Sequence, residues 1–101
     1  MFVIRRSSIF SDWLHGLRDE IAKASILVRL RRAEHGNLGE CRPVGDGISE
    51  MIIDVGKGYR VYFVKTGKVI YVVLCGGSKK TQKTDIITAK VLAVAAKKAE
   101  K

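Results

Sequence analysis

The chain has 101 residues, a length that suits one domain with one modest hydrophobic core, so we expect a single domain over residues 1–101. Two cysteines, Cys41 and Cys75, are too few for a disulfide framework and lack metal-ligand spacing. They predict buried thiols in a reducing, cytoplasmic compartment. We expect no metal and no cofactor. No apolar run reaches the roughly 20 residues of a membrane helix, and no signal peptide is visible, so we expect no membrane contact.

The charge of the chain is uneven. Residues 1–55 carry eight Lys or Arg and eight Asp or Glu, whereas residues 56–101 carry eleven and two. The formal net charge of +9 therefore lies in the second half, and most of it remains without Lys97, Lys98 and Lys101. A one-sided basic surface favours a polyanionic partner, of which nucleic acid is the commonest; the alternative is a basic surface that serves solubility alone.

The first half predicts a short strand and two helices. Residues 2–6, FVIRR, favour the strand. Apolar residues at helical spacing predict an amphipathic helix over 9–17 and a second, antiparallel helix over 19–35. The expected helix ends are marked by Ser7 or Ser8, Asp19 and Gly36.

The second half changes to a period of two and then returns to a helix. The extended segments are joined by short glycine-containing turns, which predicts an antiparallel meander. An alanine-rich helix over 84–101 follows the polar loop 78–82, with Thr84 as its N-cap. The fold class is therefore α+β: an N-terminal strand, two helices, a curved antiparallel sheet and a C-terminal helix. The extended segments are 41–44, 48–55, 59–65 and 68–77, and the residues of the last helix expected to face the sheet are Ile87, Val91, Val94 and Ala95.

The common catalytic motifs are absent from the sequence. The GDG and GKG stretches connect strands, which is the wrong context for a phosphate-binding loop. His15 and His35 are better explained as residues on helix surfaces or ends. Glu50 and Asp54 could form an acid pair, but their even spacing along a strand equally suits a solvated face.

A cationic cluster is the chemistry that the second half offers. In YRVYF, residues 59–63, the odd positions suit the core, so Arg60 and Tyr62 are expected on the open face of the sheet. Lys79 and Lys80 would approach Arg60 if the neighbouring strands pair. Such a cluster binds phosphate, and arginine can neutralise the charge of a phosphorane-like transition state, while lysine or tyrosine can transfer protons. The alternative, a merely solvated face, stays open.

Four stretches together resemble a known family: GNLGE, VGDGISE, GYRVYF and LCGGSKKTQKTDI. With them, residues 10–92 resemble the HigB-type "addiction module killer" branch of the RelE/ParE toxin superfamily. The resemblance implies a compact toxin with two N-terminal helices on a curved antiparallel sheet. It also implies a cognate antitoxin, usually a small helix-turn-helix protein. In the RelE branch the implied activity is endoribonuclease cleavage of mRNA in the ribosomal A site, by an mRNA interferase that inhibits translation and arrests growth.

The resemblance also implies which residues act. Arg60 matches the arginine of the GYR element, and Lys79 or Lys80 matches the basic residue after the strand-end glycines, so these three are the candidate catalytic residues. Ile52 stands where this branch usually has arginine, and no catalytic tyrosine is apparent near Thr84. Two alternatives remain: a ParE-like toxin with a protein target such as DNA gyrase, and a degenerate toxin that still binds its antitoxin. The candidate RNA-binding residues are Lys57, Tyr59, Tyr62, Lys65 and Lys83.

Overall fold

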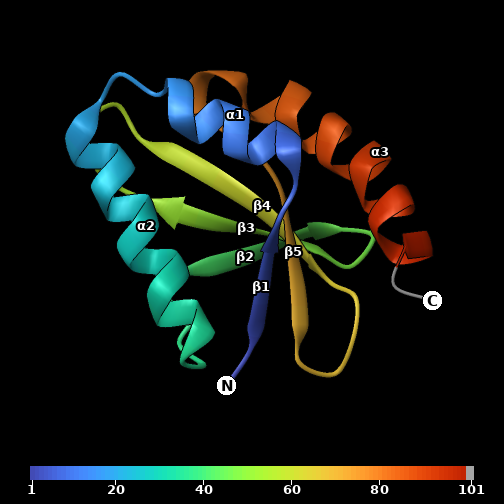
Figure 1. The fold of residues 1–101 in the computed structure, drawn as a ribbon. Helices are drawn as coiled ribbons and strands as arrows, with labels where there is room; N and C mark the ends of the chain where they lie inside the picture. Colours follow the sequence, from blue (N-terminus) through green and yellow to red (C-terminus); the bar gives the residue numbers. More distant parts are fainter. Residues whose placement is uncertain (100–101) are drawn as a thin grey trace.

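The computed structural model describes residues 1–99 and has the expected α+β architecture (Figure 1). The predicted strands and helices are confirmed with small shifts at their ends. The polar loop instead contains a short 3-10 helix, α3 begins before Thr84, and predicted helix residues 100–101 lie outside the described residues. The elements are β1 (Val3–Arg6), α1 (Ser8–Gly16), α2 (Glu20–Glu34), β2 (Cys41–Gly45), β3 (Ile48–Ile53), β4 (Tyr59–Lys65), β5 (Ile70–Ser78), η1 (Lys79–Thr81) and α3 (Gln82–Ala99).

The first two helices begin and end where local side-chain chemistry dictates. The Ser7 hydroxyl accepts a 3.0 Å hydrogen bond from the Phe10 amide and so caps α1. Asp19 caps α2 in the same way, with its carboxylate accepting from the Ala22 amide at 3.0 Å. Gly36 follows the last turn of α2 with a φ of 94°, a conformation that glycine adopts without steric cost.

The sheet has the strand order β1-β5-β4-β3-β2. Strands β2 to β5 form the expected antiparallel meander. The sequence did not predict a partner for the N-terminal strand: β1 pairs in parallel with β5, so the five-stranded sheet is mixed. A strand so short carries no signal for its direction, which depends on the path that the chain takes through α1 and α2.

Helices cover both faces of the sheet. On one face α1 packs mainly on β5, and α2 packs on β1 and β3. Figure 1 shows α1 across one end and α2 descending beside the sheet, so the two helices lie against the sheet rather than along each other as an antiparallel pair. On the other face α3 packs on β5 and β4. The central strand β4 is therefore buried on both sides, in two separate apolar clusters.

The buried side of α3 differs from the prediction. Ala89 and Ala93 are buried against the sheet, whereas Ile87, Val91 and Val94 are exposed, so the prediction that these three face the sheet is wrong. The helix has apolar side chains on two sides, and the small alanine side chains allow its backbone to approach the strands closely. The expected open face of β4 consequently lies beneath a helix.

Candidate nucleic-acid interface

A polar hollow of about 360 Å³ lies where β3 ends and β4 begins. Four cations line it, Arg42, Lys57, Arg60 and Lys79, together with the carboxylates Glu40 and Asp54; we call this site the basic hollow. Since the cations outnumber the carboxylates, the site favours an anionic group. Its remaining lining residues are Ile52, Gly56 and Gly58.

The turn of residues 56–58 holds two of these cations together. Gly56 and Gly58 have φ values of 57° and 85°, which glycine tolerates better than other residues. The Gly58 carbonyl accepts a 3.0 Å hydrogen bond from the amide of Lys79, at the start of η1. This bond places the turn beside η1, so that Lys57 and Lys79 line the basic hollow. An adjoining hollow of about 430 Å³ is lined by Lys57, Ser78, Lys79 and Lys80.

Arg60 contributes to the basic hollow from a buried position. Only 7% of the residue is exposed, because α3 covers this face of β4. Its guanidinium donates to the Tyr59 carbonyl at 3.1 Å, and its Nε lies 3.9 Å from Glu50 Oε1. Within the described part of the chain, that Nε has no hydrogen-bond partner. Arg60 is therefore a buried cation whose guanidinium is fixed by its neighbours, and not a solvated side chain on an open face of the sheet.

Glu50 is the residue that sequence reasoning misjudged. It is neither part of an acid pair nor solvated: it is 1% exposed. Its carboxylate accepts from Arg42 Nε at 3.0 Å and from Gln82 Nε2 at 3.1 and 2.9 Å. One buried carboxylate thus joins β2, β3 and the start of α3 beside Arg60. The sequence did contain a signal for this burial, because Glu50 follows the apolar Ile48 by two residues and so lies on the same face of the strand. Ile48 is also buried.

The two predicted aromatic contacts are not on the surface. Tyr59 is buried on the opposite face, where its hydroxyl donates to Asp19 Oδ2 at 3.2 Å; burial and this hydrogen bond raise its pKa. Tyr62 is fully buried beneath α3, and burial together with the nearby Glu50 raises its pKa above the ordinary value. Burial leaves little of either ring exposed for the predicted contact with RNA.

The other predicted lysines lie at different places. Lys65 is at the far end of β4, with its Nζ 5.7 Å from the Tyr71 ring centroid. Lys83 is exposed on the first turn of α3. The structure therefore brings Lys57, Arg60 and Lys79 together and adds Arg42, which the sequence did not single out. The basic hollow includes neither Lys65 nor Lys83, and Lys80 lines only the adjoining hollow.

The comparisons place the chain in a family. Residues 12–98 match the model of the family described as "Phage derived protein Gp49-like (DUF891)". The chain belongs to the Gp49-like family. A protein of Haemophilus influenzae strain Rd, described as an uncharacterized protein, is 46% identical to it over 90 residues, or 89% of this chain and 91% of that protein. The Gp49-like family is RelE/toxin-like, which confirms the coarser part of the resemblance.

The paired glycines of this Gp49-like chain have a packing role. A Cβ atom on Gly76 would lie 2.5 Å from Trp13 Cζ3, on the face that α1 covers. A Cβ atom on Gly77 would overlap the Asp85 carboxylate and the Thr81 hydroxyl, which hydrogen bond to each other on the α3 face. The glycines thus allow both helices to approach β5, and they bring η1 to the edge of the basic hollow.

The two cysteines are free thiols, and Cys75 is buried as predicted while Cys41 is half-buried. Burial and the nearby Asp85 raise the pKa of Cys75 to about 12. Among residues 1–99, no group of three or more His, Cys, Asp and Glu side chains is placed to hold a metal ion. No helix in the same range combines the length and the apolar character that crossing a membrane requires.

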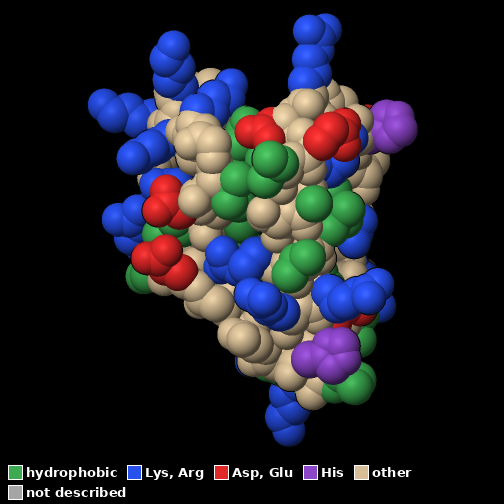
Figure 2. Space-filling view, turned by 90° about the vertical axis from the view of Figure 1, so that its left-hand side faces the viewer, with side chains coloured by type: hydrophobic (Ala, Val, Ile, Leu, Met, Phe, Trp, Pro, Cys, Tyr) green, Lys and Arg blue, Asp and Glu red, His purple; other side chains and the backbone are tan. Residues whose placement is uncertain are grey.

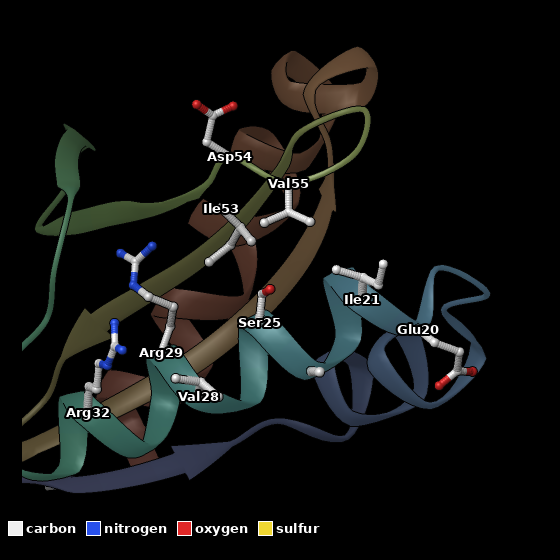
Figure 3. Close-up of a pocket in the computed structure, with 10 residues that line it drawn as sticks. Glu20, Ile21, Ser25, Val28, Arg29, Arg32, Ile53, Asp54 and Val55 are labelled. Atoms are coloured by element: carbon white, nitrogen blue, oxygen red, sulfur yellow. The ribbon is translucent and has the colours of Figure 1, made fainter.

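A third hollow, of about 590 Å³, lies between α2 and the end of β3 (Figure 3). It is mainly apolar, and we call it the apolar hollow. Seen from the α2 side, the surface mixes cations and anions around hydrophobic side chains (Figure 2). Arg29 lies at the edge of the apolar hollow. Its guanidinium donates to the backbone carbonyls of Ile52, Leu38 and Glu40 at 2.6, 3.3 and 3.1 Å. Since this arginine is occupied with backbone groups, the apolar hollow offers less to a phosphate than the basic hollow does.

Proposed function

We propose that this Gp49-like chain is the toxin of a type II toxin–antitoxin module, that it inhibits translation by cleaving mRNA on the ribosome, and that a cognate antitoxin neutralises it. The basic hollow is the observation that carries the proposal. Membership of a RelE/toxin-like family supports the class of protein, and the charge of residues 56–101 supports a polyanionic target. The partners are then the ribosome, mRNA and the antitoxin.

In this proposal the basic hollow receives the phosphate at the cleaved bond. The mRNA 2′-oxygen attacks the neighbouring phosphorus, the bond from phosphorus to the 5′-oxygen breaks, and a 2′,3′-cyclic phosphate and a 5′-hydroxyl form. Arg60 and Lys57 stabilise the negative charge that grows on the phosphate oxygens. Asp54 or Glu40 accepts the proton of the 2′-hydroxyl, and Lys79 donates a proton to the leaving 5′-oxygen.

The buried setting of Arg60 suits this role. A guanidinium fixed by the Tyr59 carbonyl and by Glu50 need not be ordered when the substrate arrives. Lys57 and Lys79 are exposed and can approach the RNA from the rim of the basic hollow. The buried cation therefore acts as a preorganised element, and the exposed cations act as mobile ones.

Substitution of Lys79 tests the activity most cleanly because this residue is exposed and its replacement spares the core. Lys79→Ala, and Asp54→Asn combined with Glu40→Gln, should each relieve growth arrest on induction and slow mRNA cleavage in a translating extract by about 10²-fold or more, the usual contribution of acid–base catalysis. Lys65→Ala, at the far end of β4, is the matched control and should cleave normally. Unchanged cleavage by both test variants would refute the mechanism.

A ParE-like toxin with a protein target is the second candidate, and one observation favours it. None of the nine described residues that line the basic hollow is aromatic, so nothing there stacks on a base, and Ile52 occupies the position of the expected arginine. DNA damage without mRNA cleavage after induction would support this candidate. A chain that is harmless when produced alone but binds its antitoxin would instead indicate a degenerate toxin.

A further inference from the structure

The outer side of α3 carries an apolar stripe that is largely exposed in the described residues 1–99. Ile87, Val91 and Val94 are 65%, 68% and 58% exposed. Their spacing of four and then three residues is that of the seam of a coiled coil. The opposite side of the helix, at Ala89 and Ala93, already packs on the sheet. Figure 1 shows α3 as the outer layer of that face.

Lysines run along one flank of this stripe. With Ile87 and Val94 at d positions of a heptad and Val91 at a, the g positions are Lys83, Lys90 and Lys97. The e positions, Thr88 and Ala95, are uncharged. Charges at these flanking positions decide which helix pairs with which, so the stripe has a defined electrostatic preference.

Among residues 1–99, the Asp46 carboxylate lies near this flank and does not cancel its charge. Lys90 Nζ is 3.9 Å from Asp46 Oδ2, and Lys97 donates to the Asp46 carbonyl at 3.0 Å. Both contacts are at the surface, and each ammonium keeps further donors for a partner. On the helix itself, Asp85 accepts from Thr81 beside Gly77, on the sheet side. The flank therefore stays predominantly positive.

We propose that this stripe is the docking site of an acidic amphipathic helix of the antitoxin, an inference that rests on the proposed function. Apolar residues of the partner would cover Ile87, Val91 and Val94, and its Glu or Asp side chains would face the lysine flank. A second copy of the chain fits less well. Antiparallel pairing would place lysine flanks against each other, and parallel pairing would give them only uncharged neighbours.

The position of the stripe also explains how such a helix would neutralise the toxin. Helix α3 continues directly from η1, which carries Lys79 and Lys80 beside the basic hollow. Lys80 precedes Ile87 by seven residues, or roughly 10 Å along a helix. An acidic helix that runs past Ile87 would therefore bring its end to these lysines and compete with phosphate.

The test uses two synthetic helical peptides of several heptads, with leucine at a and d and either glutamate or lysine at e and g. Binding to the full chain is measured by fluorescence anisotropy. The glutamate peptide should bind and the lysine peptide should not. Val91→Asp should weaken binding by about tenfold or more, the effect of losing a buried valine. Ile21→Asp is the matched control, since Ile21 is 72% exposed on α2, and it should bind normally.

A charge reversal and a cell assay complete the test. Lys90→Glu combined with Lys97→Glu should transfer the preference to the lysine peptide. In cells, the Val91→Asp variant should still arrest growth. Co-production of the protein encoded beside its gene should no longer relieve that arrest. If the wild-type chain did not arrest growth, the proposed function would be refuted. The peptide-binding result would then test the docking site by itself. Equal binding of both peptides, dimerisation that Val91→Asp abolishes, or binding only to anionic phosphatidylglycerol vesicles would overturn the inference.

Discussion

Replacing Lys57 and Lys79 together by alanine removes two of the four cations that line the basic hollow. Both side chains are exposed, so the core should be unaffected. For single-stranded nucleic acid, a plot of the logarithm of the binding constant against the logarithm of the salt concentration has a slope of about −0.7 for each phosphate that the protein neutralises. Four contacts predict a slope of about −2.8, and two contacts predict about −1.4. Between about 50 and 200 mM salt, affinity should fall about 50-fold for the wild type and about 7-fold for the variant.

The slopes are measured by fluorescence anisotropy of a labelled single-stranded RNA over a series of salt concentrations. Lys65→Ala with Lys68→Ala is the matched control, since it removes the same charge from the opposite end of β4 and the adjoining turn. This control should keep nearly the wild-type slope. If both double variants reduced the slope equally, binding would depend on overall charge, and the reasoning from the basic hollow would be refuted.

Three further predictions concern stability, measured by urea denaturation. Glu50→Gln should lower the free energy of unfolding by about 3 kcal/mol, because it leaves the buried Arg60 without its counter-charge; an unchanged value would refute the role of the pair. Gly76→Ala should cost about 1–3 kcal/mol by forcing Trp13 aside, and a neutral result would show that the ring moves freely. Burial raises the pKa of Cys75 from 9.0 to about 12, so the unfolded chain loses the thiol proton first. Stability should therefore fall as pH rises above 9, and Cys75→Ala should reduce that slope by up to about 1.4 kcal/mol per pH unit.

Much of the local structure follows from the sequence, because short-range patterns encode it. The alternation in YRVYF correctly predicts that Tyr59, Val61 and Phe63 face the core under α1 and α2. The expectation that Lys79 and Lys80 approach Arg60 holds for Lys79, since the register pairs Arg60 with Gly77, two residues before Lys79, and both cations line one hollow. Lys80 lines only the adjoining hollow. Alternation, caps and the turns that join neighbouring strands all act over a few residues, which a single sequence displays.

The setting of the candidate site was decided by the tertiary structure. The sequence of α3 is apolar on two sides, so its period does not indicate which side is buried. The structure packs Ala89 and Ala93 on the sheet and leaves Val91 outside. That one choice buries Tyr62 and Arg60, which the strand alone presents as an open face. The sequence by itself determined the helices and strands and the cationic composition of the site. Only long-range packing determined which cations are buried and fixed, which are exposed, and which apolar stripe remains available to a partner.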